Sequence, residues 1–441
     1  MGCAKNTVDS NSMAQLLMRD GYQFSQEPEN ANVLIVNTCG FIGPAKDESF
    51  EELRKLAELK KDDQILIAAG CLTQRYGAEV ARKIPGVDGV LGTRRWMDIV
   101  QVVRELRNGS HPEPLYHLPT DAVTVGTNEQ NTLRVSVEGA SAYVKIADGC
   151  RRPCAFCAIP LIKGTAVSRP IDTILDEARY LSDSGIRELM LIAQDTTDYG
   201  HDLGVKDGLA ILLERITETV PDMDWIRILY AYPGAVSDRL IDVMAEREQI
   251  LPYLDIPLQH AHPKTLYRMK RPSNIDWVHK TLAKMRAKIP NLAIRTTFIV
   301  GYPGETDEEF QALLDFVEEI RFDRVGAFQF SFEEGTTSAS LGDPVPASVK
   351  QERYAALMEL QQGISLQINQ SFVGKTLDVL VEGIENGTWT GRSYRDAPEI
   401  DGKVLLEGEP DIGQIVPVRI TGAFVYDLSG VPVTQNLVQI Q

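Results

Sequence analysis

Three cysteines lie close together near the middle of the chain, and their spacing suits metal chemistry. Cys150, Cys154 and Cys157 form a CxxxCxxC loop directly after a predicted strand. Such a loop can bring three thiolates to a four-iron cluster and leave one iron open for another ligand. A structural zinc site is the alternative, but zinc usually takes four ligands, and His117, the nearest histidine in sequence, is far from the loop.

The remaining cysteines, Cys3, Cys39 and Cys71, are too far apart in sequence to form a local finger. Two of them follow strand-like runs: Cys39 comes after residues 33–38 and Cys71 comes after residues 65–70. The ends of strands in one parallel sheet share an edge, so these thiols are expected to meet there. A second open cluster is one interpretation, and three buried structural cysteines are the other.

Length and composition limit the classes of protein that the chain can belong to. At 441 residues it should divide into roughly two to four domains. No apolar run reaches the roughly 18 to 20 residues of a membrane span, and the N-terminus lacks the pattern of a secretory signal, which predicts a cytoplasmic protein. The net charge of −17 repels phosphate backbones, so nucleic acid is not expected to be the main ligand.

Strand and helix patterns predict an α/β protein built from three units. Short β-branched runs alternate with amphipathic stretches as far as residue 106, and six further strand-like runs alternate with helical patterns in the middle of the chain. The predicted domains are an N-terminal α/β cluster domain (1–107), a linker (108–135), a partial (β/α)6 barrel with a connecting helix (136–370) and a small C-terminal β-barrel (371–441). The predicted strands are 33–36, 65–69, 87–91, 142–146, 188–192, 225–229, 254–257, 293–300, 324–330, 376–381, 403–406, 415–420 and 423–428, and the predicted helices are 48–59 and 346–369.

Polar residues and glycines at strand ends are further candidates for a binding site. Gln194 and Asp195 end a predicted strand, where ligands of such sheets bind, although Asp195 could equally cap a helix. Gly301 and Pro303 belong to a turn after the run 293–300, where glycine would permit a nucleoside to approach the backbone. An ordinary βα turn is the alternative for that segment.

The cysteine pattern resembles the radical S-adenosylmethionine superfamily, and with the N-terminal cysteines it resembles the methylthiotransferase family. The resemblance implies that Cys150, Cys154 and Cys157 hold one 4Fe-4S cluster, which binds S-adenosylmethionine, with Phe156 beside the adenine. It further implies a second 4Fe-4S cluster on the N-terminal cysteines and a C-terminal TRAM domain. S-adenosylmethionine would then supply both a methyl group and, from a second molecule, a radical.

Several segments resemble the branch of this family that modifies a ribosomal protein. That branch implies transfer of a methylthio group to the β-carbon of an aspartate in the twelfth protein of the small ribosomal subunit, with an electron donor such as flavodoxin or ferredoxin. From Phe372 onward the chain has ten acidic and five basic residues, which suits a basic protein better than tRNA. The segments are 2–6, 8–10, 37–42, 194–196 with 199–200, 255–261 and 391–401.

Two other functions stay open at this point, and one feature departs from the family pattern. The same chemistry on tRNA adenosine is the runner-up, and a non-catalytic iron–sulfur carrier or binding protein is the third hypothesis.

The family has a strand immediately before its first cluster cysteine, whereas only Met1 and Gly2 precede Cys3 here. We therefore expect an unpaired sheet edge and a less firmly held Cys3.

Overall fold

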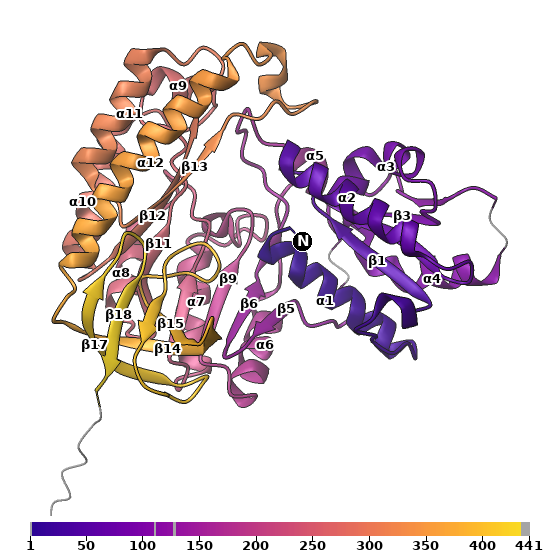
Figure 1. Ribbon diagram of the computed structural model, residues 1–441, viewed down its shortest axis with the longest axis horizontal. Coiled ribbons are helices and arrows are strands. Elements are labelled where there is room, and N and C mark those ends of the chain that lie inside the picture. Colours follow the sequence, from indigo (N-terminus) through magenta and orange to yellow (C-terminus); the bar gives the residue numbers. More distant parts are fainter. Residues whose placement is uncertain (1, 110–111, 127–128, 434–441) are drawn as a thin grey trace, which may run out of the picture.

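Three units meet around the start of the chain in the computed structural model (Figure 1), which describes residues 2–109, 112–126 and 129–433. An N-terminal α/β unit and a large open barrel lie side by side, and a small β-barrel packs below the large one. The α/β fold class predicted from the sequence is thereby confirmed. Within the described ranges, no helix combines the length and apolar character required to cross a membrane.

The N-terminal unit is a four-stranded parallel sheet with helices on both faces, in the order β1-β2-β3-β4. The run ILIAAG makes β2 an inner strand, because it is buried between the two helical layers. Helices α2 and α3 cover one face of the sheet, and α1 and α4 cover the other. The elements are α1 (Ala4–Arg19), η1 (Pro28–Asn30), β1 (Val33–Thr38), α2 (Gly43–Leu59), β2 (Ile65–Gly70), α3 (Cys71–Lys83), β3 (Gly89–Gly92), η2 (Thr93–Asp98), α4 (Ile99–Asn108) and β4 (Leu115–His117).

The fourth strand of this sheet lies inside the segment 108–135, which was predicted to be a linker. Strand β4 pairs in parallel with β3, so the N-terminal sheet continues beyond residue 107. The strand is only three residues long, which is too short for an alternating apolar pattern to stand out.

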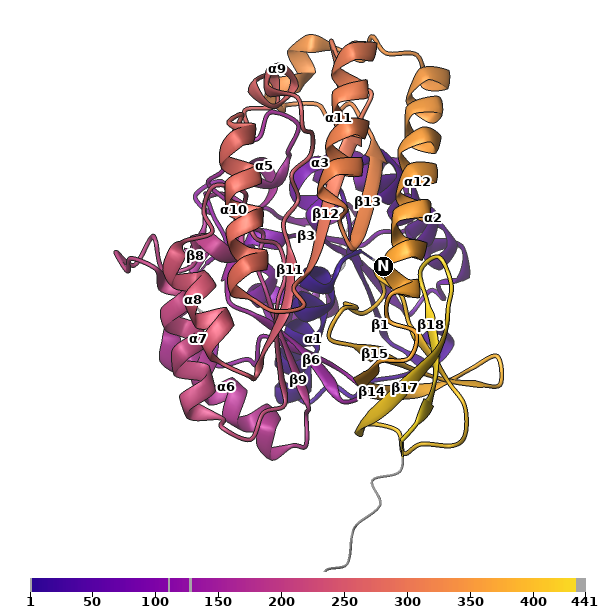
Figure 2. The same cartoon turned by 90° about the vertical axis from the view of Figure 1, so that its left-hand side faces the viewer.

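The large barrel is an open sheet in which six parallel strands follow the order β13-β12-β11-β10-β9-β6, and β5 pairs antiparallel with β6 at the other edge. Helices line its outer side in the turned view (Figure 2) and enclose the largest apolar core. The strands are β5 (Val135–Glu138), β6 (Ser141–Lys145), β7 (Ala147–Asp148), β8 (Val167–Ser168), β9 (Glu188–Ile192), β10 (Trp225–Ile228), β11 (Ile250–Asp255), β12 (Ala293–Val300) and β13 (Arg324–Gln329). The helices are α5 (Ile159–Lys163), α6 (Ile171–Asp183), η3 (Thr196–Asp198), α7 (Gly208–Thr219), α8 (Asp238–Glu246), α9 (Pro263–Arg268), α10 (Ile275–Lys288), α11 (Asp307–Ile320), η4 (Thr337–Leu341) and α12 (Ala347–Gln370).

One barrel strand begins earlier than its sequence pattern indicated. The predicted strand 254–257 corresponds to β11, which starts at Ile250 and contains Pro252. Proline has no backbone N–H to donate, and strand pairing between β10 and β11 is irregular at this point, with a register shift between Ile226 and Ile228. The irregular pairing accommodates the proline that obscured the strand in the sequence.

The C-terminal unit is a closed five-stranded barrel with the order β14-β15-β16-β18-β17. A strand was predicted at 423–428, but the last strand of the barrel begins only at Leu428. Strand β15 was not predicted, because its sequence TWTGRS contains few apolar residues. The strands are β14 (Thr376–Glu385), β15 (Thr388–Ser393), β16 (Val404–Leu406), β17 (Ile415–Ala423) and β18 (Leu428–Pro432).

The C-terminal barrel is fixed to the large barrel by a buried ion cluster around Glu188, the first residue of β9. The Glu188 carboxylate accepts hydrogen bonds from Arg227 at 2.7 Å and from Arg392 of β15 at 2.6 Å. Burial opposes ionisation, but the two guanidinium groups lower the pKa of Glu188 to about 2. The two units therefore share a charged interface that is satisfied only when they are joined.

Candidate active site

The three N-terminal cysteines lie at the ends of neighbouring elements, as the sequence predicted for Cys39 and Cys71. The strand residues that precede them, Thr38 and Gly70, are paired in register across β1 and β2. Cys71 then begins α3, and Cys3 occupies the N-cap position of α1. In the described part of the sheet β1 is an edge strand, and Cys3 is exposed.

Side-chain amides attach the start of α1 to the end of β1. Asn6 donates to the carbonyl of Asn37 at 3.0 Å, and Asn37 donates back to the carbonyl of Asn6 at 2.8 Å. Gly70 has a φ of +103°, and a Cβ there would lie 2.6 Å from the carbonyl oxygen of Thr38. Only glycine permits this close approach, which brings Cys71 toward Cys39.

The three N-terminal thiols are close enough to influence one another electrostatically. Burial raises the pKa of Cys71 to about 12, and the nearby thiols of Cys3 and Cys39 add to that increase. Burial raises the pKa of Cys39 as well. Desolvation by the surrounding protein opposes ionisation of the Cys3 thiol. The positive charge of Lys5 and hydrogen bonds from the backbone N–H groups of Lys5 and Asn6 outweigh this effect, so the pKa of Cys3 is lowered.

Each sulfur of the CxxxCxxC loop receives one N–H donor. The backbone N–H of Arg152 donates to Cys150 and that of Ile159 donates to Cys157, both at 3.4 Å. The guanidinium of Arg271 donates to the sulfur of Cys154 at 3.4 Å. Hydrogen bonds to sulfur stabilise thiolate ligands and tune the potential of iron–sulfur clusters, so this donor set fits such a cluster.

Burial favours the protonated thiols of Cys150 and Cys157. It raises the pKa of Cys150 to about 11 and that of Cys157 to about 12, with further contributions from the other loop thiols. A coordinating metal displaces the proton and stabilises the thiolate. In the described ranges, no three His, Cys, Asp or Glu side chains are arranged to bind one metal ion, and the assignment of clusters to these thiols is a proposal.

A buried ion network joins the two cysteine groups. The carboxylate of Asp9 on α1 contacts Arg134 and Lys145 at 2.6 Å and Lys163 of α5 at 2.7 Å. Asp148, two residues before Cys150, contacts the same three cations at 2.7 to 3.5 Å. Burial opposes ionisation, but these cations hold the pKa of Asp9 far below its ordinary value. Helix α1, which follows Cys3, is thus fixed to the segments on both sides of the CxxxCxxC loop.

Asp9 and Lys163 were not predicted from the sequence to be members of this network. Asp9 entered the sequence-based prediction only as part of the segment 8–10. A carboxylate and a lysine that are far apart in sequence carry no spacing signal, so only the fold reveals that they meet.

The predicted cofactor contacts near the loop occupy different environments. Phe156 packs beside the buried Tyr302 and Phe330. The Oε1 atom of Gln194 is buried without a hydrogen-bond partner among the described residues, so it is free to bind a ligand. Asp195 accepts from the backbone N–H of Thr197, as the helix-cap alternative predicted, and its other oxygen pairs with Arg152 at 2.5 Å.

The turn that contains Gly301 and Pro303 packs against the protein itself. Both residues are buried, Gly301 has a φ of +71°, and a Cβ at this position would collide with the side chain of Lys350. The hydroxyl of Tyr302 meets that of Ser338 at 2.6 Å. The close approach that Gly301 permits is therefore to α12, whereas a contact of this turn with a cofactor stays a prediction.

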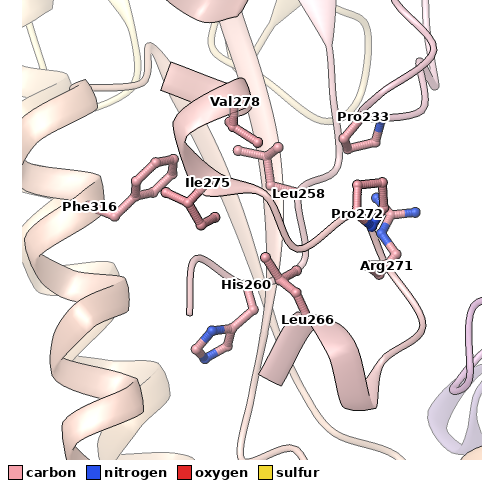
Figure 3. A pocket seen from close by; sticks show the side chains of 9 residues that line it. All are labelled: Pro233, Leu258, His260, Leu266, Arg271, Pro272, Ile275, Val278 and Phe316. Atoms are coloured by element: carbon pink, nitrogen blue, oxygen red, sulfur yellow. The ribbon is translucent and has the colours of Figure 1, made fainter. Parts of the chain in front are cut away.

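A small cavity lies between Arg271 and His260 (Figure 3). Its volume of about 10 Å³ suffices for one water molecule but not for a nucleoside. His260 accepts from the backbone N–H of His262 through Nδ1 at 2.9 Å and lies 3.1 Å from Glu305 through Nε2. A buried imidazole with these partners holds the two segments that contain His260 and Glu305 together. The lining residues are Pro233, Leu258, His260, Leu266, Arg271, Pro272, Ile275, Val278 and Phe316.

Family models match three consecutive parts of the chain. The uncharacterized protein family UPF0004 matches residues 1–92, the radical SAM superfamily matches 144–317, and the TRAM domain matches 373–433. The three matches coincide with the three units of the fold. The radical SAM match supports an iron–sulfur cluster and S-adenosylmethionine as cofactors.

Curated relatives match the chain over nearly its whole length. A protein from Chloroflexus aurantiacus, named ribosomal protein uS12 methylthiotransferase RimO, is 48% identical and aligns with 98% of each chain. Proteins of the same name from Roseiflexus sp. and Thermoanaerobacter sp. are 45% and 43% identical over 98% of this chain and 95% and 98% of theirs. The chain belongs to the RimO family. Membership of the RimO family confirms the resemblance that the sequence motifs indicated.

Solved structures share the fold of this RimO family member at low sequence identity. A radical S-adenosylmethionine methyltransferase, TsrM from Kitasatospora setae, solved with tryptophan and a cofactor analogue, has a TM-score of 0.59 at 11% identity. The alignment covers 87% of this chain and 77% of that one. A second structure of TsrM, with cobalamin and a [4Fe-4S] cluster, has a TM-score of 0.56 at 11% identity over 86% of this chain and 78% of the other. The likeness supports the radical SAM fold.

Proposed function

We propose that the chain is a radical S-adenosylmethionine methylthiotransferase that modifies the β-carbon of an aspartate in ribosomal protein uS12. The observation that carries this proposal is the alignment over 98% of both chains with a relative named for that activity. The network around Asp9 supports it, because the network joins two groups of three cysteines, as a reaction that uses two clusters requires.

We assign the two cysteine groups to two 4Fe-4S clusters. Cys150, Cys154 and Cys157 would hold the first, and when bound it supplies an open iron for S-adenosylmethionine and the electron that generates a radical. Cys3, Cys39 and Cys71 would hold the second. The protein contributes N–H donors to the sulfurs and a fixed relation between the two groups.

Four groups around the first cluster are the candidates for cofactor contacts. Gln194 offers an unpaired buried oxygen to the ribose or methionine part of the cofactor, and Phe156 offers an aromatic surface to the adenine. Asp195 would act through Arg152, to which it is paired. The turn of Gly301 and Pro303 would contact the cofactor through its backbone.

The C-terminal barrel supports a basic protein as the substrate. Two of its five basic residues, Arg392 and Arg395, are buried in ion pairs with Glu188 and Asp323 of the large barrel. Two of its acidic residues, Asp396 and Asp401, are likewise buried in ion pairs, with Arg324 and Arg295 of the large barrel. The surface that remains therefore keeps the excess of acidic over basic residues that the sequence shows. An acidic surface attracts a basic protein and repels tRNA. A ribosomal substrate implies activity in the cytoplasm, with an electron donor such as flavodoxin or ferredoxin.

Mass spectrometry of uS12 tests this function directly. The anaerobically reconstituted protein is incubated with uS12, S-adenosylmethionine and a reductant, and the tryptic peptides of uS12 are analysed. A methylthio group in place of one hydrogen on a single aspartate is the expected product. An unmodified uS12 together with a methylthio group on tRNA adenosine would show that the nucleic-acid branch is correct. Intact S-adenosylmethionine would favour a non-catalytic iron–sulfur carrier.

A further inference from the structure

Lys5 stands in the first turn of α1, directly beside the proposed second cluster. It lies two residues after Cys3 and one helical turn before Asp9, so Lys5 and Asp9 share a face of the helix. Asp9 is fixed to the large barrel, and the neighbouring Ala4 and Val8 pack against the inner side of that barrel. Lys5 is therefore directed toward the same interior and is half-buried there.

A strained residue of the barrel lies against the Lys5 ammonium. The Nζ atom of Lys5 is 3.2 Å from the centroid of the Tyr230 ring, which follows β10. Tyr230 has a φ of +64°, a left-handed conformation that is costly for an aromatic residue and is concentrated at functional sites. Its carbonyl accepts from the backbone N–H of Thr196 at 3.1 Å, and its N–H donates to Asp255 at 3.4 Å. The strand end is thus constrained to present this ring to the ammonium.

Lys5 differs from the cations around it because it lacks a carboxylate partner. Among the described residues, none places a carboxylate oxygen within 4.0 Å of its ammonium. The groups that face it are Tyr230, Cys3 and Asp255, and Asp255 already binds Arg295 at 2.9 Å. A half-buried cation without a counterion favours the binding of an anion. The neighbouring cations with carboxylate partners are Arg134, Lys145, Lys163, Arg227, Arg295 and Arg392.

We propose that Lys5 binds the side-chain carboxylate of the substrate aspartate and so selects aspartate over asparagine. This inference rests on the proposed function. The β-carbon that receives the methylthio group is bonded to the carboxylate carbon, so a cation that holds the carboxylate fixes the reacting carbon. Because Lys5 follows Cys3 so closely, the bound aspartate lies beside the proposed source of sulfur. Tyr230 keeps the ammonium in place before the substrate arrives.

Peptide binding to the reconstituted holoenzyme tests the proposal. Two synthetic peptides with the sequence of the modified uS12 loop are compared, one with the target aspartate and one with asparagine in its place. A charge-assisted hydrogen bond should make the aspartate peptide bind about 10- to 100-fold more tightly to the wild type. Lys5→Met should abolish this preference, and Lys5→Arg should restore part of it. Lys206→Met, which alters an exposed lysine before α7, serves as the matched control and should keep the preference.

Further measurements separate the possible outcomes. Lys206→Met should retain the iron content of the wild type and its formation of 5'-deoxyadenosine. Lys5→Arg keeps a positive charge beside Cys3, so a preference for aspartate that Lys5→Arg retains and Lys5→Met lacks reports the charge at this position. An unchanged preference for aspartate in Lys5→Met would overturn the role of Lys5 while the modification of uS12 by the wild type still stands. Failure of the wild type to modify uS12 would instead overturn the proposed function, and the role of Lys5 with it.

Discussion

Replacement of Asp9 by asparagine removes the one carboxylate of α1 that the barrel holds in the buried network. Its two oxygens contact Arg134, Lys145 and Lys163 at 2.6 to 2.7 Å. Each charged hydrogen bond contributes about 1.5 to 3 kcal/mol, so independent loss of three would cost about 5 to 9 kcal/mol. Asp148 remains to hold the same cations, which should reduce the cost to about 3 to 5 kcal/mol, the usual penalty for breaking a buried ion pair.

Urea unfolding at pH 7, followed by tryptophan fluorescence, measures this penalty. Trp96 is a useful probe because its ring lies 4.1 Å from the guanidinium of Arg134. Asp176→Asn is the matched control, since Asp176 pairs with Arg179 at an exposed position of α6 and should contribute at most about 1 kcal/mol. If Asp9→Asn unfolds within about 1 kcal/mol of this control, the reasoning about the network is refuted.

Two further predictions concern the loop and the domain interface. Gly149→Ala should lower the iron content, because Gly149 has a φ of +76° and a Cβ there would lie 2.7 Å from the carbonyl carbon of Thr165. Gly185→Ala is the control: Gly185 has a φ of +84°, but a Cβ there would meet no other atom, so this variant should keep the iron. The depressed pKa of Glu188 stabilises the fold by about 3 kcal/mol above pH 4.5, and this contribution is lost as the pH falls toward 2. Glu188→Gln should therefore flatten the fall in urea midpoint between pH 5 and pH 3, and parallel profiles would contradict this.

The sequence predicted the elements with strong local patterns and missed the contacts that depend on the fold. Strands 188–192 and 293–300 are found with those bounds, because apolar runs of that length allow few alternatives. The neighbouring positions of Cys39 and Cys71 also followed from local reasoning, since both come directly after parallel strands whose last residues, Thr38 and Gly70, are paired.

The sequence could not indicate which charged residues of one unit of the fold pair with charged residues of another unit. Glu188 begins a buried strand, and its partner Arg392 lies in a β-strand of another unit that the pattern did not reveal. Lys5 likewise lies within a recognised segment, but its role depends on the unusual backbone of Tyr230. Left-handed geometry at an aromatic residue has no signature in the sequence, because it is imposed by the contacts of Thr196 and Asp255.

Helix α1 sets the distance and the relative orientation of the two cysteine groups. It begins at the residue after Cys3, and its Asp9 is fixed beside the CxxxCxxC loop. One residue inserted between these positions would turn Cys3 by about 100° about the helix axis relative to Asp9 and move it by about 1.5 Å along that axis. The spacing from Cys3 to Asp9 should therefore tolerate no change in length, whereas insertions in the segment between β4 and β5 would leave this distance unaltered.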